Sequence, residues 1–178
     1  IHHETGNVIV FNGEIYNFKE IRKELIDSYR LTFQTESDTE VILKSFSTWG
    51  IQAVQKFIGM FAFVLFDNIE KKVYLCRDRA GVKPLFYYKK DNLLLFGSEL
   101  KAISAHPQFI KEIDQNSVAG FLQKAWIPAP HTIYQNTFKL LPGNFAVLDL
   151  KSKDFKQEKY WDIIDFFNKG ETKVSEHE

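Results

Sequence analysis

The residues whose types and spacing could do chemistry lie in three short stretches of the sequence. Asn12-Gly13-Glu14 combines an amide, a backbone that can approach a ligand closely and a carboxylate. Asp38 stands at the expected start of a helix, and Arg77-Asp78-Arg79 is soon followed by Lys83. Considered alone, each stretch has an ordinary structural explanation: an Asn-Gly turn, a carboxylate favoured by the helix dipole, and an internal charge network that fixes a loop.

The sequence argues against several other kinds of site. It contains no phosphate-binding loop of the G-x-x-x-x-G-K-[ST] type and no dinucleotide-binding glycine fingerprint. Its histidines show no metal-ligand spacing, and with a single cysteine a zinc site is not expected. These histidines are His2, His3, His106, His131 and His177. The cysteine, Cys76, lies in the apolar pattern 73–76 and is predicted to be a small core residue rather than a nucleophile.

Composition and charge indicate a folded domain without an electrostatic preference. Of the 178 residues, 44% are hydrophobic and 15% aromatic, which is enough for a sizeable core in one domain. Lys and Arg total 23, as do Asp and Glu, so charge gives no case for nucleic acid or an anionic membrane as a partner. The longest apolar run, 60–66, is too short to span a bilayer. A single cysteine allows no intrachain disulfide, and a cytoplasmic location is expected.

Periodicity places these stretches on specific elements. A strand at 7–11 ends in the Asn-Gly pair, and a helix at 18–29 follows, with Asn17 as a candidate N-cap. The sequence Ser37-Asp38-Thr39-Glu40 is typical of a capping box. It predicts a second helix that runs to about Trp49 and stops at Gly50. A shorter helix is expected at 52–58.

The rest of the chain is predicted to be largely antiparallel β-structure. Hairpins are expected from 60–67 with 72–77 and from 85–88 with 93–97, and 138–141 is a candidate partner of 144–150. The strand at 61–66 is apolar on both faces, which indicates a sheet covered on both sides. With short helices at 100–105 and 117–125, the predicted fold class is α+β, with sheets between helix layers. We expect the domain to span 1–164 and 165–178 to be a linker or tail.

Six short sequences occur in the order of one known family over about 8–162. They are NGEIYN at 12–17, SDTE at 37–40, GMFAF at 59–63, an R-D-x-x-G-x-K-P-L-x-Y pattern at 77–87, an F-x-S-E-x-K-A pattern at 96–102, and LPG at 141–143. The last lacks one proline of the family's L-P-P-G turn. Together they resemble the class II glutamine amidotransferase domain, especially the N-terminal domain of glutamine-hydrolysing asparagine synthetases.

This resemblance implies a fold and a reaction. The fold is that of an N-terminal-nucleophile hydrolase, a four-layer αββα sandwich with two mainly antiparallel sheets. The reaction is the hydrolysis of glutamine to glutamate and ammonia. Asn12 and Gly13 match the family's oxyanion hole, which uses the Asn side-chain amide and the Gly backbone N–H. Glu14 and Asp38 match positions that hold the α-ammonium group of the substrate glutamine.

The family's nucleophile is expected to be missing from these residues. Family members use the thiol of the first residue of the processed chain, and the α-amine of that residue, with an ordinary pKa of about 8, can serve as base. Here the first residue is Ile1, and no Arg precedes Asn12 to hold the substrate carboxylate. An upstream segment is therefore expected to be absent. Residues 1–178 alone are predicted to lack glutaminase activity.

The resemblance also implies a longer enzyme. Ammonia passes in such enzymes to a C-terminal synthetase domain of the same chain, which uses ATP and Mg²⁺ to activate aspartate and form asparagine. The S-G-G-L-D-S motif of that domain does not occur here, so no cofactor is expected in this domain. The oligomeric state is left open, with a homodimer as one candidate. The alternatives are an amidase serving a sugar-phosphate, phosphoribosyl or polysaccharide acceptor, and a non-catalytic glutamine-binding domain.

Overall fold

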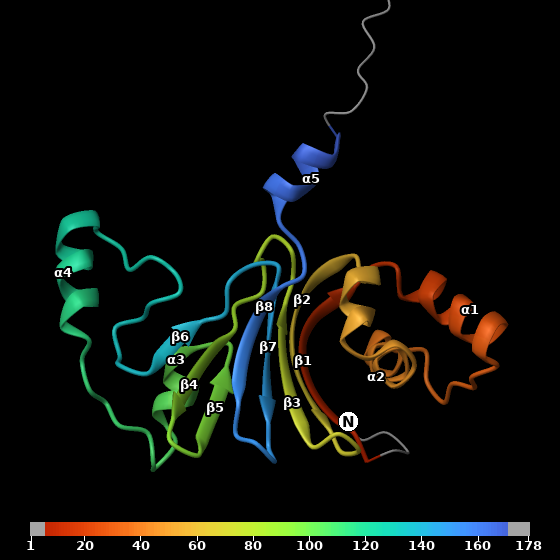
Figure 1. Ribbon diagram of the computed structural model, residues 1–178, viewed down its shortest axis with the longest axis horizontal. Helices are drawn as coiled ribbons and strands as arrows, with labels where there is room; N and C mark the ends of the chain where they lie inside the picture. The colour runs from red at the N-terminus through yellow and green to blue at the C-terminus, as the bar shows by residue number, and fades with distance from the viewer. Residues whose placement is uncertain (1–5, 171–178) are drawn as a thin grey trace, which may run out of the picture.

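The computed structural model describes residues 6–170, which form two antiparallel sheets with helices outside them (Figure 1). The larger sheet has five strands in the order β1-β2-β3-β7-β8, and the smaller has three in the order β5-β4-β6. The strands of the larger sheet are β1 (Val8–Ile15), β2 (Gly59–Asp67), β3 (Lys72–Arg77), β7 (Asn144–Asp149) and β8 (Phe155–Lys159). Those of the smaller sheet are β4 (Phe86–Lys90), β5 (Leu93–Gly97) and β6 (Thr137–Lys139).

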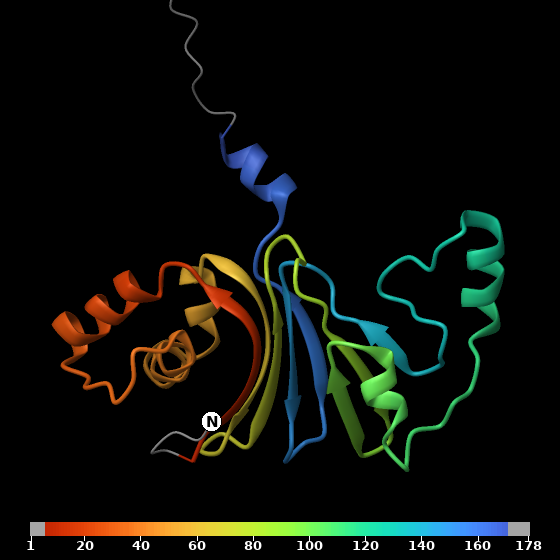
Figure 2. The same cartoon turned by 180° about the vertical axis from the view of Figure 1, so that it is seen from behind.

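Helices lie on the outer side of each sheet (Figures 1 and 2). The helices α1 (Phe18–Tyr29) and α2 (Asp38–Trp49) and the 3₁₀ helix η1 (Gly50–Lys56) accompany the larger sheet. On the side of the smaller sheet are α3 (Leu100–Ser104) and α4 (Gln115–Lys124), and α5 (Ile163–Gly170) leads away from the sheets. A helix with the length and apolar character needed to cross a membrane does not occur within 6–170.

Strand β2 separates two hydrophobic cores. Phe61, Phe63 and Leu65 are buried against α1 and α2, whereas Ala62 and Val64 are buried against the smaller sheet. Successive strand residues point to opposite faces, so an uninterrupted apolar run supplies both cores at once. A third cluster joins the smaller sheet to α3. The order helix, sheet, sheet, helix confirms the predicted α+β sandwich of four layers.

The two N-terminal helices confirm the local sequence patterns. Helix α1 has the predicted bounds, and α2 begins directly after Ser37, whose Oγ accepts a hydrogen bond from Glu40 N at 3.3 Å. Gly50 ends α2 with a φ of 58°, a conformation that glycine adopts at little cost, and its N–H donates to Phe46 O. The helix expected at 52–58 is the 3₁₀ helix η1, which follows α2 without a break.

The expected pairing of 138–141 with 144–150 is wrong. Strand β6 pairs with β4 in the smaller sheet, and β7 pairs with β3 and β8 in the larger one. The chain crosses between the sheets at Pro142-Gly143, where Gly143 has a φ of 65°. Strand β8 was not predicted, because residues 156–159 are exposed and polar. Charged side chains are typical of an edge strand, which is the place of β8 in the described sheet.

The end of the described chain is helical. Helix α5 covers the start of the segment predicted to be a linker or tail, 165–178, and residues 171–178 lie outside the described part. Its side chains Ile163, Ile164 and Phe167 are exposed.

A buried carboxylate fixes the crossing from β3 to the smaller sheet. Asp78 is 1% exposed and follows β3 directly. Its carboxylate accepts hydrogen bonds from three backbone N–H groups, those of Phe61 at 3.2 Å, Val82 at 3.0 Å and Lys83 at 3.0 Å. These backbone N–H groups find in Asp78 the acceptor that a neighbouring strand would otherwise provide, and they compensate its buried charge.

Arg77 satisfies the carbonyl groups of the same crossing. Its guanidinium donates to the carbonyl oxygens of Lys83 at 2.8 Å, Gly81 at 2.8 Å and Leu140 at 2.6 Å. Burial lowers the pKa of Arg77, opposed by the nearby charge of Asp78. Because Leu140 follows β6, one side chain of the larger sheet is bonded to the backbone of the smaller sheet. The loop is fixed internally, but by hydrogen bonds between these side chains and backbone groups rather than by the expected charge network.

Asp78→Ala is expected to lower the free energy of unfolding by about 3 kcal/mol, because three backbone donors lose a charged acceptor at a buried site. Asp27→Ala, at an exposed position of α1, is the matched control and should change it by less than about 0.5 kcal/mol. Urea denaturation measures both. Equal stabilities of the two variants would show that the Asp78 carboxylate does not hold the crossing.

Candidate active site

The predicted site begins on β1, at one edge of the larger sheet as described (Figure 1). The register pairs Asn12 with Ala62 and Gly13 with Phe61 of β2. Directly paired residues point to the same face of a sheet. Ala62 belongs to the core between the sheets, so Asn12 also faces the space between them, at its open edge.

The side chain of Asn12 is exposed and bridges the two sheets. Its Nδ2 donates a hydrogen bond to Ser98 Oγ at 3.0 Å. Ser98 lies between β5 and α3, so the NGEIYN and F-x-S-E-x-K-A sequences meet here. Sequence reasoning missed this contact, because a side-chain pair 86 residues apart leaves no local pattern.

Gly13 has a backbone that other residues do not fit. Its φ is +145°, and a Cβ at this position would lie 2.1 Å from the carbonyl oxygen of Met60. The neighbouring strand has the reciprocal constraint, since a Cβ on Gly59 would lie 2.1 Å from Glu14 O. The two strands therefore approach closely at this end. The glycine leaves its backbone N–H without a side chain beside it.

Asp38 reaches the end of β1 from the first turn of α2. Its Oδ2 accepts a hydrogen bond from Ile15 N at 3.1 Å, and its Oδ1 accepts one from Thr39 Oγ1 at 3.4 Å. Glu14 directly precedes Ile15, and its side chain is exposed. The bond from Ile15 therefore places Asp38 at the end of β1 where Glu14 follows the Asn-Gly pair, so both carboxylates predicted to bind an ammonium group lie at this end.

A second buried carboxylate holds the start of α2. Glu40, which is 9% exposed, accepts hydrogen bonds from Gln34 N at 2.9 Å, Thr35 N at 2.7 Å and Thr35 Oγ1 at 2.7 Å. Lys44 Nζ lies 3.7 Å from Glu40 Oε1. Burial acts to raise the pKa of Glu40, but these hydrogen bonds and the Lys44 charge outweigh it, so the pKa is lowered. The carboxylate thus ties down the loop that leads to Asp38.

Asn17 does not cap α1 with its side chain, which corrects the prediction. Its Nδ2 donates to Lys56 O at 3.0 Å, and its Oδ1 accepts from Ile58 N at 2.9 Å. Tyr16 N donates to Ile58 O at 2.7 Å. The end of the NGEIYN sequence is therefore bound to the segment between η1 and β2, because both polar ends of the amide find backbone partners there.

Cys76 is separate from this site. Its side chain is fully buried in the core between the larger sheet and α2, and burial raises the pKa of the thiol well above its ordinary value. The thiolate is the nucleophilic form of cysteine, and a buried protonated thiol is inert. Cys76 is thus a core residue, as predicted.

The other polar groups considered from the sequence form no metal site in the described part of the chain. Within 6–170, no group of three or more His, Cys, Asp or Glu residues is placed to hold a metal ion. His2, His3 and His177 lie outside those residues. Glu99 and Lys101, beside Ser98, form an exposed ion pair at 2.8 Å.

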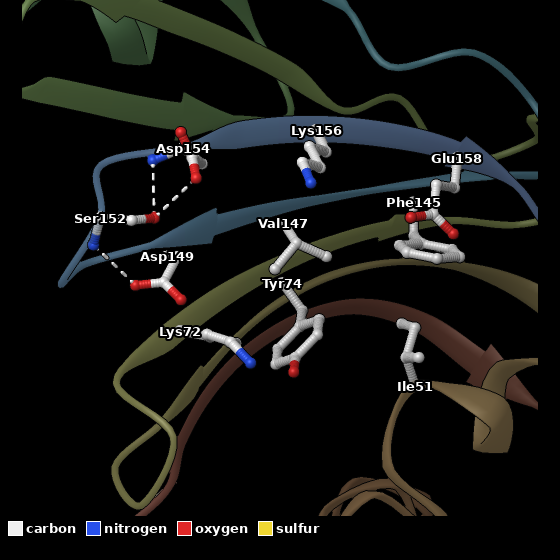
Figure 3. Close-up of a pocket in the computed structure, with 10 residues that line it drawn as sticks. All are labelled: Ile51, Lys72, Tyr74, Phe145, Val147, Asp149, Ser152, Asp154, Lys156 and Glu158. Carbon is white, nitrogen blue, oxygen red and sulfur yellow. Dashed lines mark hydrogen bonds between the residues drawn. The ribbon is translucent and has the colours of Figure 1, made fainter.

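A groove of about 350 Å³ lies on the larger sheet, apart from the predicted site (Figure 3). Its walls come from β3, β7, β8 and the turn between the last two, together with Ile51 of η1. Two of its acidic side chains serve that turn. Asp149 accepts from Lys151 N at 2.8 Å and Ser152 N at 3.0 Å, and Ser152 Oγ donates to Asp154 at 2.9 Å. The groove contains none of the predicted site residues.

Two solved structures share this architecture. The glutamine phosphoribosylpyrophosphate amidotransferase of Bacillus subtilis, complexed with ADP and GMP, has a TM-score of 0.61 and 18% identity, and the match covers 90% of this chain and 30% of that one. A structure described as the allosteric regulatory enzyme of purine biosynthesis has a TM-score of 0.60 and 19% identity, covering 87% of this chain and 28% of that one. The likeness confirms a fold of the N-terminal-nucleophile-hydrolase type.

A family model described as the glutamine amidotransferase domain matches residues 1–161. The chain therefore belongs to this family. A Methanocaldococcus jannaschii protein that carries the name of a glutamine-hydrolysing asparagine synthetase is 38% identical over 161 residues. The glutamine-hydrolysing asparagine synthetases 2 and 3 of Bacillus subtilis are 33% and 35% identical over 168 and 156 residues. The matches cover 89%, 91% and 87% of this chain but only 30%, 22% and 25% of the relatives, so the chain spans less than a third of their length.

Gly13→Ala is expected to lower the free energy of unfolding by about 3 kcal/mol, because it combines an unfavourable φ with overlap on the Met60 carbonyl. Gly50→Ala places an alanine in another conformation that favours glycine, with φ 58° and ψ −145°, but in open space, and should cost about 2 kcal/mol. Gly120→Ala, inside α4 with open space around it, should stabilise by about 0.5 kcal/mol. Urea denaturation ranks the three. A Gly13 variant no worse than the Gly50 variant would contradict the close approach of β1 and β2.

Glu40→Gln is expected to destabilise the protein by about 2 kcal/mol at neutral pH, because three hydrogen bonds lose their charged acceptor. The pKa of Glu40 is lowered in the folded protein. Its stabilisation is therefore fully present above the ordinary value of 4.5 and is lost as pH falls through the lowered pKa. The gap in unfolding free energy between wild type and variant should narrow below pH 4.5.

The matched control is Glu36→Gln, whose side chain is 91% exposed in its pair with Arg22. It should change the free energy of unfolding by less than about 0.5 kcal/mol both at neutral pH and below pH 4.5. A Glu40→Gln effect that stays constant from neutral to acid pH would show that the ionised carboxylate is not what binds the loop.

Proposed function

We propose that this domain is the glutaminase part of an asparagine-synthetase-like enzyme and hydrolyses glutamine to glutamate and ammonia. One observation carries the proposal, the hydrogen bond from Ile15 N to Asp38 Oδ2. It brings the Asp38 carboxylate to the end of β1 that carries the Asn12 amide, the open backbone of Gly13 and the Glu14 carboxylate. Membership of the glutamine amidotransferase family and the names of the relatives support glutamine as the substrate.

The Asn-Gly pair is assigned to the oxyanion hole. Attack on the side-chain carbonyl of glutamine produces a tetrahedral oxyanion, which is stabilised most by donors already in place. Asn12 donates one amide hydrogen to Ser98 and keeps the other. Gly13 supplies a backbone N–H that a substrate can approach closely. Both donors stand at the open edge between the sheets.

Glu14 and Asp38 are assigned to the α-ammonium group of glutamine. Hydrogen bonds between an ammonium group and a carboxylate are charge-assisted and stronger than neutral ones. Asp38 keeps acceptor capacity beyond its bonds from Ile15 and Thr39. Within 6–170, the side chain of Glu14 has no protein partner. A ligand without an ammonium group would leave these acceptors unmatched, which favours an amino acid as substrate.

The nucleophile is assigned to a cysteine at the native N-terminus, as the resemblance implies, because the buried thiol of Cys76 is unsuited to the role. The α-amine of that residue takes the thiol proton, and the sulfur attacks the amide carbon. The C–N bond then breaks, and ammonia leaves with the proton. Water cleaves the resulting thioester and releases glutamate. The net reaction consumes one glutamine and one water.

Aspartate is the proposed acceptor of the ammonia in the whole enzyme. Support comes from the relatives, which carry the name asparagine synthetase and are more than three times as long as the match. The partner of this domain is then a C-terminal synthetase domain of the same chain, which uses ATP and Mg²⁺. Other ammonia acceptors, and glutamine binding without catalysis, are told apart by the reaction products.

The full-length native protein is expected to release glutamate from glutamine and to form asparagine when aspartate, ATP and Mg²⁺ are present. Asp38→Ala should raise the KM for glutamine by at least about tenfold, since a charge-assisted hydrogen bond to the substrate is lost. Asp27→Ala should leave KM unchanged. Release of glutamate without formation of asparagine would show that the ammonia acceptor is not aspartate. No glutamate from a folded protein that carries its cysteine would favour a glutamine-binding domain.

A further inference from the structure

The side chain of Asn12 depends on a single restraint. It is exposed on an edge strand, and its one hydrogen-bond partner within 6–170 is Ser98. An exposed asparagine without a partner samples several rotamers, and its broad terminal torsion leaves the amide plane free to turn. A donor in an oxyanion hole has to stand in place before charge develops. The bond to Ser98 is therefore the feature that decides where the Asn12 amide points.

Ser98 itself stands on a turn that is packed closely against α3. It follows Gly97, which pairs with Phe86 at the end of β5 and is so close to α3 that a Cβ on it would lie 3.3 Å from Ala102 Cβ. The helix is anchored by Ile103, which is 2% exposed in the cluster beneath α3. The hydroxyl is thus held by the smaller sheet, while Asn12 belongs to the larger one.

We propose that Ser98 is a positioning residue of the glutaminase site. Its Oγ accepts one N–H of the Asn12 amide and so directs the second N–H toward the oxyanion. Both hydrogens lie on the same planar nitrogen, so fixing the direction of one fixes the direction of the other. The inference rests on the proposed function. It adds that the oxyanion hole is assembled across both sheets, with a donor from β1 and its support from the end of β5.

Steady-state kinetics of the full-length protein test this role. Loss of one oxyanion donor typically costs about a hundred- to a thousandfold in rate, and a donor that is present but unrestrained should cost less. Ser98→Ala is therefore expected to lower kcat about tenfold with little change in the KM for glutamine. Ser98→Thr keeps a hydroxyl acceptor and should retain most of the activity. Ser104→Ala, whose Oγ donates to Lys101 O within α3, is the matched control and should be unaffected.

A double variant separates positioning from a general effect on folding. If Ser98 acts only through Asn12, the Asn12→Ala and Ser98→Ala double variant should be no slower than Asn12→Ala alone. Losses that multiply in the double variant would overturn the proposal. An unchanged kcat in Ser98→Ala would overturn it as well.

A spectroscopic readout keeps this inference distinct from the proposed function. The side-chain amide of Asn12 gives a pair of ¹H–¹⁵N resonances in the 178-residue chain. Ser98→Ala should move this pair, while Ser104→Ala should leave it in place. An unmoved pair would refute the contact whatever the kinetics show. If the contact is present but the wild type releases no glutamate, the proposed function fails, and the positioning role fails with it.

Discussion

The buried carboxylate of Asp78 is the interaction on which the two-sheet arrangement depends. The chain leaves the larger sheet after β3 and returns to it before β7, and at such crossings the backbone loses its ladder partners. The Asp78 side chain satisfies three N–H groups, and its own carbonyl accepts from Gly143 N at 2.9 Å at the returning crossing. Arg77 satisfies the carbonyl groups. These bonds join the two sheets at both crossings, and the contact between Asn12 and Ser98 spans the same two sheets.

The carboxylates of this domain fall into two groups with different surroundings. Asp78 and Glu40 are buried and accept three hydrogen bonds each from backbone or hydroxyl groups, and Glu40 also lies beside Lys44, so the charge of both is already compensated within the protein. Asp38 is half-buried and Glu14 exposed, and both retain acceptor capacity at the end of β1. The first pair holds the loops in place. The second pair is the one we propose to bind the ammonium group of the substrate.

Local patterns predicted the elements of this fold better than its pairings. The apolar run of β2 and the capping residues of α2 each act through neighbours in sequence, so the sequence alone predicts both elements. The sequence does not predict the strands with which β6 and β7 pair, because a short apolar strand fits either sheet equally well. Strand β8 carries mostly polar side chains, so it lacks the apolar pattern from which a strand is predicted. At the site, the family resemblance predicted Asn12 and Asp38. The hydrogen bonds of Asn17 to Lys56 and Ile58 could not be predicted, because they involve backbone groups that no sequence motif reveals.

The unequal width of the two sheets explains why the residues of the proposed site are open to solvent. On β1, Val10 shares a face with Asn12, because the two residues are two positions apart along the strand. Its partner Val64 on β2 is 5% exposed, yet Val10 is 58% exposed. Within the described residues, the cover supplied by the three-stranded sheet therefore ends between β2 and β1. Asn12 stands just beyond that limit, where the inter-sheet space opens to solvent.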